Sequence, residues 1–211
     1  MSEINTYLSK CREAIHNAIN DQDISTGLAT FGYDQDKIME GKGLYDAAKA
    51  ADDTQNNLHA KDRQASDDYK QLRKQVNDTY TKHLDVARVA FEDNTHAYNE
   101  LLLNGKRERG LGEWEKQCGT FYRVLIENAT LQAIFNNFIP QTEVTATNAS
   151  FLHVLQLHEN YTVARAEAQD ATDVRKKAIR NLRKWMKAFH KIARVAFADS
   201  PQKLEKVGIK A

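Results

Sequence analysis

The sequence has few residues that break a helix. Only two prolines occur, at positions 140 and 201, and the nine glycines cluster at 27–43, at 105–119 and at 208. Two long stretches, 44–104 and 141–200, therefore contain neither proline nor glycine. Sustained alternation of apolar and polar residues, the signal for a half-buried strand, is also missing. These absences predict an all-α protein.

Cysteine and long apolar runs are scarce as well. Cys11 and Cys118 are too few for a disulfide framework, and they lack the paired spacing of a zinc site. Residues 1–7 show no basic stretch followed by an apolar run, and no apolar segment approaches the roughly 20 residues of a membrane span. We therefore expect a soluble cytoplasmic protein with reduced thiols and no transmembrane segment.

Apolar residues in the two uninterrupted stretches recur at steps of three and four, as in a coiled-coil seam. The seam of the first stretch consists of Ala48, Ala51, Leu58, Ala65, Tyr69, Leu72, Val76, Val86 and Ala90. That of the second consists of Phe151, Val154, Tyr161, Ala168, Ile179, Leu182, Met186, Phe189, Ala193 and Ala196. Both seams weaken midway. The pattern predicts long helices at 44–92 and 146–199, either continuous or broken near their polar middles.

The chain is also internally repeated. Residues 86–93 match residues 192–199 at an offset of 106, with six identities in eight positions. At an offset of 107, Tyr7 and Cys11 align with Trp114 and Cys118. A repeat of this length predicts duplicated architecture. We therefore divide the chain into helical repeat 1 (1–106) and helical repeat 2 (107–211), and we expect them to form one joint structural domain.

The sequence pattern predicts the same order of helices and loops in each repeat. These are a helix (3–20 and 111–127), a short helix (24–31 and 129–138), a loop (34–43 and 141–150), the long helix and a short closing helix. Asn94 and Ser200 are expected to cap the closing helices, which Gly105 and Gly208 should end. Neither long helix can bury its seam alone, so the expected fold is an elongated helical bundle. In it the pseudo-symmetric repeats pair their long helices as an antiparallel coiled-coil-like unit.

Two segments carry a resemblance to known sequences. The run from Trp185 to Phe197, with Pro201-Gln202, Leu204-Glu205 and Gly208-Ile209 after it, resembles the ending of a family of uncharacterised bacterial helical proteins. Residues 31–34, leading to 40–42, are similar to the same family. The resemblance implies an internally duplicated helical unit. It implies no activity and no functional residues.

Motifs for catalysis or metal binding are weak. Glu13 and His16 have the Glu-x-x-His spacing of carboxylate-bridged di-iron bundles, but a second such pair is missing. No histidine has a twin at its repeat-equivalent position, and no nucleophile elbow, Walker or dinucleotide-binding motif occurs. We therefore predict no enzyme, no catalytic or metal-ligating residue and no cofactor. A metal-binding helical bundle is retained as a minor alternative.

The strongest charge signal lies near the end of repeat 2. Residues 175–194 contain nine basic residues and no acidic one, and repeat 1 has 13 basic and 18 acidic residues against 17 and 11 in repeat 2. Such a helix could contact phosphates or an anionic surface. The candidate contact residues are Arg175, Lys176, Arg180, Arg183, Lys184, Lys187 and Lys191. Alternatively, this basic flank faces acidic residues of repeat 1, namely Asp52, Asp53, Asp62, Asp67 and Asp68. Trp185 and Phe189 are expected in the core.

Three functions follow from these patterns. The first is a non-enzymatic interaction or scaffold protein that contacts a protein partner or self-associates, with the loops 34–43 and 141–150 as its contact surface. The second, less favoured, is a protein that binds nucleic acid or an anionic surface through 175–194. The third is the metal-binding bundle.

Overall fold

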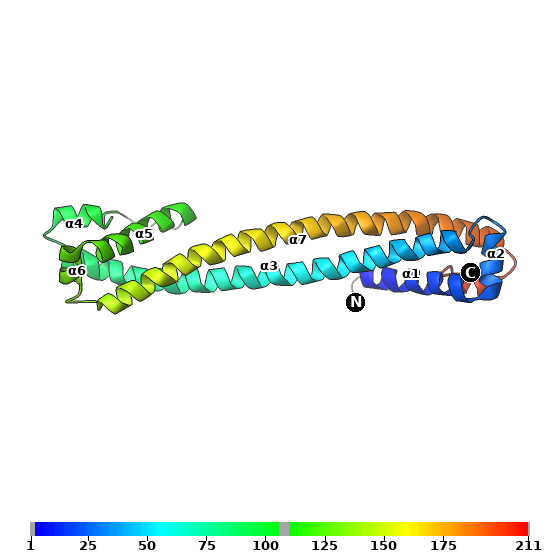
Figure 1. Ribbon diagram of the computed structural model, residues 1–211, viewed down its shortest axis with the longest axis horizontal. Coiled ribbons are helices and arrows are strands. Elements are labelled where there is room, and N and C mark those ends of the chain that lie inside the picture. The colour runs from blue at the N-terminus through cyan, green and yellow to red at the C-terminus, as the bar shows by residue number, and fades with distance from the viewer. Residues whose placement is uncertain (1–2, 106–109, 211) are drawn as a thin grey trace. The chain divides into compact units, whose positions relative to one another are not determined.

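A computed structural model describes residues 3–105 and 110–210, and all of the regular structure in these residues is helical (Figure 1). The helices are α1 (Glu3–Asn20), α2 (Gln22–Ala29), α3 (Gln35–Ala90), α4 (Thr95–Glu100), α5 (Leu111–Glu127), α6 (Ala129–Phe135), α7 (Gln141–Ala196) and α8 (Pro201–Lys206). The all-α prediction is confirmed. The two long helices, α3 and α7, pack against each other.

The long helices are longer than the sequence predicted. Each has 56 residues and is continuous, and the two begin 106 residues apart, the offset at which the sequence repeats. They begin at 35 and 141 rather than at 44 and 146. The Asp34 carboxylate accepts a hydrogen bond from the Lys37 backbone N–H at 2.9 Å and so caps α3. The expected loops at 34–43 and 141–150 are therefore wrong, because both segments form the first turns of long helices.

Close packing explains why a glycine lies inside α3. A Cβ atom added to Gly41 would lie 2.3 Å from the nearest atom of the Trp185 ring. The indole thus occupies the space that any side chain at position 41 would need. In the sequence this glycine indicates a turn, whereas in the structure it makes room for an aromatic ring from α7.

The shorter helices follow the repeat. Helices α1 and α5 have the predicted bounds, whereas α2 begins and ends two residues early and α6 ends three residues early. Asp21 caps α2 by accepting from the backbone N–H groups of residues 23 and 24. Asn128, 107 residues later, caps α6 in the same way through residues 130 and 131. Equivalent caps thus hold equivalent helices in the two repeats.

The closing helices confirm most of the predicted boundary residues. Asn94 caps α4 by accepting from the Ala97 backbone N–H at 3.0 Å. Ser200 is the N-cap residue of α8 without a side-chain bond, and Gly208 ends α8 with φ of 80°. Gly105 does not end α4, so that prediction was wrong. Leu102, with φ of 52°, takes the left-handed position equivalent to Gly208.

The chain forms two compact units, and each combines parts of both sequence repeats. Unit 1 contains Met1–Ala60 and Ala166–Ala211, and unit 2 contains Lys61–Arg165. Unit 1 thus holds α1, α2, the first part of α3, the last part of α7, and α8. Unit 2 holds the rest of both long helices with α4, α5 and α6. The unit boundaries therefore do not coincide with the repeat boundary at 106.

The core of unit 1 is built around one face of α7. Trp185 and Phe189 are 5% and 0% exposed, and their rings stack with centroids 5.1 Å apart. Tyr33 packs against both rings. Cys11 is buried in the same core, where burial raises the pKa of its thiol. The prediction that Trp185 and Phe189 belong to the core is confirmed.

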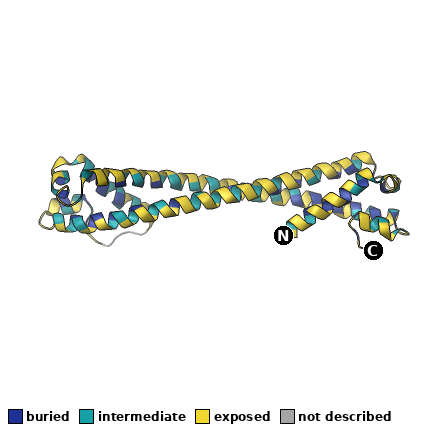
Figure 2. Cartoon of the chain, turned by 90° about the horizontal axis from the view of Figure 1, so that it is seen from below, coloured by how far each residue is buried: buried dark blue, intermediate teal, exposed yellow. Residues whose placement is uncertain are grey.

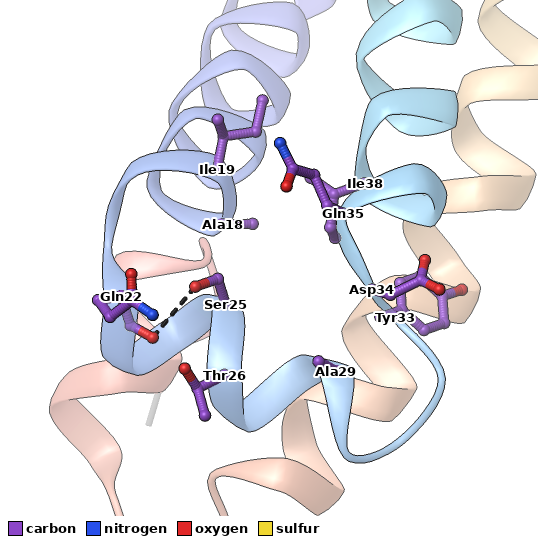
Figure 3. A pocket seen from close by; sticks show the side chains of 10 residues that line it. All are labelled: Ala18, Ile19, Gln22, Ser25, Thr26, Ala29, Tyr33, Asp34, Gln35 and Ile38. Carbon is purple, nitrogen blue, oxygen red and sulfur yellow. Dashed lines mark hydrogen bonds between the residues drawn. The ribbon is translucent and has the colours of Figure 1, made fainter.

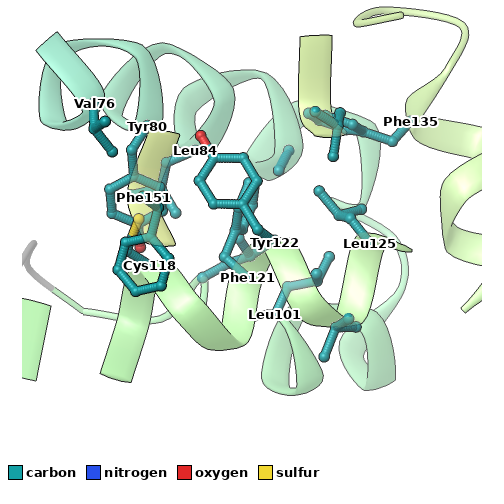
Figure 4. Packing of buried hydrophobic residues seen from close by; sticks show 14 of the residues in the cluster. Val76, Tyr80, Leu84, Leu101, Cys118, Phe121, Tyr122, Leu125, Phe135 and Phe151 are labelled. Atoms are coloured by element: carbon teal, nitrogen blue, oxygen red, sulfur yellow. The ribbon is translucent and has the colours of Figure 1, made fainter. Parts of the chain in front are cut away.

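The core of unit 2 is richer in aromatic rings (Figure 4). Tyr80, Phe121 and Tyr122 contact one another with centroids 5.1 to 6.1 Å apart, and Phe135 packs on Phe121. Cys118 is buried among them and, like Cys11, is a free thiol. Figure 2 shows that buried and exposed residues alternate along the long helices, as expected for elements with one apolar face.

Polar and aromatic pairs join the long helices within each unit. In unit 1, Arg175 Nε donates to Asp52 Oδ1 at 2.6 Å, and His59 Nε2 lies 3.0 Å from the Thr172 hydroxyl. In unit 2, the ring of Tyr69 stacks on that of Tyr161 with a centroid distance of 6.1 Å. These contacts lie at the polar middles of the predicted seams, where neither helix breaks.

Candidate nucleic-acid interface

Six basic residues form one row on the outer face of α7 in unit 1, and we call this row the basic stripe. Its members follow steps of three and four residues, so they lie on one side of the helix. They are Lys177, Arg180, Lys184, Lys187, Lys191 and Arg194, and all six are exposed. From the first to the last the stripe is about 25 Å long at about 1.5 Å per residue.

The apolar side of α7 determines the direction of the stripe. Ile179, Leu182, Met186, Phe189 and Ala193 are all buried in the core of unit 1. At about 100° per residue, the stripe falls on the opposite side of the helix from these residues. The hydrophobic packing that holds α7 in unit 1 therefore directs six cationic side chains into solvent.

The stripe is not neutralised within the described part of the chain. None of its six side chains forms an ion pair or hydrogen bond with another described residue. The exposed lysines of α3 in the same unit differ, because Lys37, Lys42 and Lys49 each pair with an acidic residue three or four positions later. Positive charge is thus balanced locally on α3 and left unbalanced on α7.

The seven predicted contact residues fall into two groups, those that lie in the stripe and those whose side chains contact other residues of the protein. Arg180, Lys184, Lys187 and Lys191 belong to the stripe, whereas Arg175, Lys176 and Arg183 have other contacts. The Arg175 guanidinium pairs with the carboxylate of Asp52, a residue that is only 3% exposed. Lys176 lies 3.1 Å from Asp173, and the Arg183 guanidinium lies over the Tyr7 ring at 5.3 Å. The basic residues of 175–194 were expected to pair with acidic residues of repeat 1. Within the described part of the chain, Arg175 is the one member of this run that does so. Lys177 and Arg194, which were not among the predicted contact residues, complete the stripe.

The equivalent row on α3 in unit 2 provides an internal comparison. Subtracting 106 from each stripe position gives Gln71, Lys74, Asp78, Thr81, Asp85 and Arg88, with two basic and two acidic residues. Lys74 pairs with Asp78 at 3.3 Å, and Arg88 pairs with Asp85 at 3.3 Å. The same surface in the other repeat is therefore neutral, so the basic stripe is not a requirement of the shared fold.

Charge separates by helix rather than by unit. The repeats differ strongly, but unit 1 contains 17 basic and 15 acidic residues and unit 2 contains 13 and 14. Because each unit draws on both repeats, the opposite net charges of the repeats largely cancel within each unit. What remains is a local concentration of positive charge on α7.

His190 is next to Lys191 of the stripe in the sequence, and its pKa is affected by burial and by the charge of Arg194, another member of the stripe. Burial and the nearby positive charge of Arg194 lower its pKa below the ordinary value of 6.5, while a hydrogen bond to the Val207 backbone acts in the opposite sense. Its Nε2 atom is buried and has no hydrogen-bond partner among the described residues. The imidazole is therefore neutral at pH 7.

This environment predicts a loss of stability in mild acid. Because the folded-state pKa lies below the unfolded value, His190 destabilises the fold as pH falls below about 6.5, and no such loss occurs above that pH. Replacing His190 with leucine, the residue at equivalent position 84, should flatten this part of the profile. Urea unfolding at several pH values over about 3 pH units, from about pH 5 to about pH 8, would measure how the free energy of unfolding depends on pH. An unchanged slope in His190→Leu would contradict the assignment.

The sequence did not predict a polar network in unit 2 that is centred on a buried histidine. His83, 1% exposed, joins Tyr122 and Glu143 from two other helices. Its Nε2 lies 3.1 Å from Glu143 Oε1, and its Nδ1 lies 3.1 Å from the Tyr122 hydroxyl. Since a carboxylate only accepts, Nε2–H donates to Glu143, and in the neutral ring Nδ1 accepts from Tyr122. Burial raises the pKa of Tyr122.

The network replaces apolar packing. In repeat 2 the position of His83 is taken by Phe189, and in repeat 1 the position of Tyr122 is taken by Ile15. A histidine at a position that is aromatic and apolar in the other repeat was the available sequence signal. The surrounding rings of Tyr122 and Phe135 enclose His83, so the network holds α3, α5 and α7 together rather than facing a cavity.

The hollow drawn in Figure 3 lies between α1, α2 and the start of α3 in unit 1. It has a volume of about 310 Å³, and its lining combines polar side chains with alanine, isoleucine and tyrosine. Two of its polar side chains have partners: the Ser25 hydroxyl donates to the Gln22 carbonyl at 3.1 Å, and the Asp34 carboxylate caps α3.

The predicted Glu-x-x-His pair does not form part of a cluster. His16 Nδ1 lies 3.2 Å from the Asn20 side chain. Among the residues that the structure describes, no group of three or more His, Cys, Asp or Glu side chains could hold a metal ion. In the same part of the chain, no helix combines the length and the apolar character that crossing a membrane requires.

Comparison of the chain with models of protein families, with curated proteins and with solved structures finds no match.

Proposed function

We propose that this chain is a non-enzymatic helical protein that binds the phosphate backbone of nucleic acid. The basic stripe of α7 is the contact surface. The observation that carries the proposal is a row of six exposed cations without acidic partners. Phosphate binding by lysine and arginine is driven largely by the release of counterions, and this supplies most of non-specific affinity for nucleic acid.

The stripe has a cost for the isolated protein. Like charges three and four positions apart on a helix repel one another, by about 0.2 to 0.5 kcal/mol for each pair. The neutral row on α3 shows that the same helix position tolerates a balanced surface. A polyanion lying along α7 would relieve the repulsion, which favours a binding role over a structural one.

The alternatives have less support. A protein partner would normally bury a large aromatic or apolar anchor, and the stripe offers only lysine and arginine heads. The contact loops expected for a scaffold at 34–43 and 141–150 are helical. Nucleic acid is therefore a better-supported partner for the stripe than another protein.

The test compares two triple variants that change net charge equally. Lys184→Gln, Lys187→Gln and Lys191→Gln together remove half of the stripe, whereas Lys37→Gln, Lys42→Gln and Lys49→Gln remove three paired lysines of α3. With up to six contacts, the wild-type slope of log affinity against log salt should reach about −5, and the stripe variant should lose about 3 of this. The α3 variant should behave as wild type. DNA-affinity elution and anisotropy would measure both.

Two results would contradict the proposal. One is the absence of salt-dependent binding by the wild-type chain at low salt. The other is an equal loss in the stripe and α3 variants, which would trace the binding to net charge rather than to the stripe.

A further inference from the structure

We infer that the nucleic acid held by the basic stripe is a duplex, and that it is bound without base readout. This inference rests on the proposed function and makes it more specific. Three features carry it: the absence of an exposed aromatic ring within the segment 177–194, the extended form of the row along one continuous helix, and the predominance of lysine.

Proteins that bind single strands usually combine a basic groove with aromatic rings on which bases stack. The aromatic residues nearest the stripe in sequence are Trp185, Phe189 and His190. The first two are buried and stacked on each other, and Tyr33 covers them further. His190 is half-buried and packs on Phe189. No aromatic ring within the stripe segment is thus free to stack on a base.

The form of the stripe suits a stiff partner. Its six cations lie along about 25 Å of one continuous helix. A duplex presents one phosphate for about every 1.7 Å of its axis, so about 15 phosphates lie along the same length. A duplex is straight over this distance because its persistence length is about 500 Å. A single strand is more flexible and would have to be straightened to follow the same row.

The residue types on the stripe disfavour recognition of sequence. Four of the six cations are lysines, which act as point charges, and bidentate recognition of guanine is mainly the work of arginine. The uncharged exposed residues beside them are Asn181, Ala188 and Val195. Direct readout would need several polar groups converging on base edges. The stripe instead matches contacts that position a protein on the backbone.

An anionic membrane is a weaker partner for the same surface. A helix that lies in a membrane interface inserts its apolar face among the lipids. The apolar face of this part of α7, which includes Leu182 and Met186, is buried in the core of unit 1. The outer face carries no exposed aromatic residue or leucine between Lys177 and Arg194. Only charge would then attract the helix to lipid.

The test measures binding of the full chain to four ligands at one low salt concentration. Fluorescence anisotropy of labelled nucleic acid reports binding, and vesicles are added as competitors. The probes are two unrelated duplexes of about 20 base pairs, a single strand of the same length, and vesicles of phosphatidylcholine with phosphatidylserine. The two duplexes should bind within about threefold of each other and about tenfold more tightly than the single strand. Vesicles should compete poorly with duplex. The triple stripe variant should lose duplex binding, and the α3 variant should keep it.

The outcomes separate the two proposals. Equal or tighter binding of the single strand, or a preference above about tenfold for one duplex, would overturn the duplex inference and leave the proposed function standing. Failure of the wild type to bind any nucleic acid would overturn the proposed function itself. Tighter binding to vesicles than to duplex would overturn both.

Discussion

Replacing Gly41 with alanine is expected to destabilise the protein by about 2 kcal/mol, even though alanine favours helix over glycine by about 1 kcal/mol. A Cβ atom at position 41 would lie 2.3 to 2.7 Å from three atoms of the Trp185 ring. The ring cannot move aside easily, because Tyr33 and Phe189 pack against it. Overpacking thus outweighs the gain in helix propensity.

Gly43 provides the matched control. It lies two residues further along α3, in the same helix and unit, and a Cβ atom added there would meet nothing within 4 Å. Gly43→Ala should therefore stabilise the protein by up to about 1 kcal/mol, through helix propensity alone. The two substitutions are chemically identical and are expected to have opposite signs.

Urea or guanidinium unfolding of both variants would measure the difference as a shift in midpoint. The expected separation between Gly41→Ala and Gly43→Ala is about 3 kcal/mol. A stabilising effect at both positions would show that Trp185 does not occupy the space above Gly41. The packing of α3 on α7 in unit 1 would then need revision.

A second large effect is expected at His83. His83→Ala should destabilise the protein by about 3 kcal/mol, because it leaves a cavity and removes one buried hydrogen bond to Tyr122 and one partly buried bond to Glu143. The imidazole contacts the rings of Tyr122 and Phe135, so the loss includes packing as well as polarity. His83→Phe retains an aromatic ring, as Phe189 does in the other repeat, and should cost only about 1 to 2 kcal/mol.

A double-mutant cycle would isolate the hydrogen bond between His83 and Tyr122. Tyr122→Phe alone leaves Nδ1 of His83 without its partner, whereas His83→Phe with Tyr122→Phe removes both polar groups. The double variant should therefore be more stable than the sum of the single losses predicts, by about 1 kcal/mol. His153→Ala, at an exposed position of α7 in unit 2, should change stability by less than about 0.5 kcal/mol. Additive single losses would mean that the two side chains act independently.

Much of the helical architecture could be predicted because its signals are local. Apolar periodicity and capping residues such as Asn94 fix where helices form and how some of them begin. The first turns of α3 could not be predicted in this way. Gly41 breaks local helix propensity but is needed by Trp185, which lies far away in the sequence. The composition of the units was also out of reach, since a tandem repeat does not reveal which halves pack together.

The candidate site was partly predictable. The basic run indicated the correct part of α7, but only burial and pairing distinguish Arg175, held by Asp52, from Lys177 and Arg194, which face solvent. Steps of three and four residues along the run would have picked out the six-membered row. The network at His83 could have been noticed from a histidine that replaces Phe189 in the repeat alignment.

The combination of both repeats in each unit has an evolutionary consequence. A chain with one repeat would carry only part of each unit, so it could complete a unit only by pairing with a second copy. Fusion of two such copies would place the whole assembly in one polypeptide. In a symmetric pair every substitution occurs twice, whereas in a fused chain each copy can change alone. Such independence would allow equivalent positions to differ, as Phe189 and His83 do, and equivalent surfaces to be basic on α7 and neutral on α3.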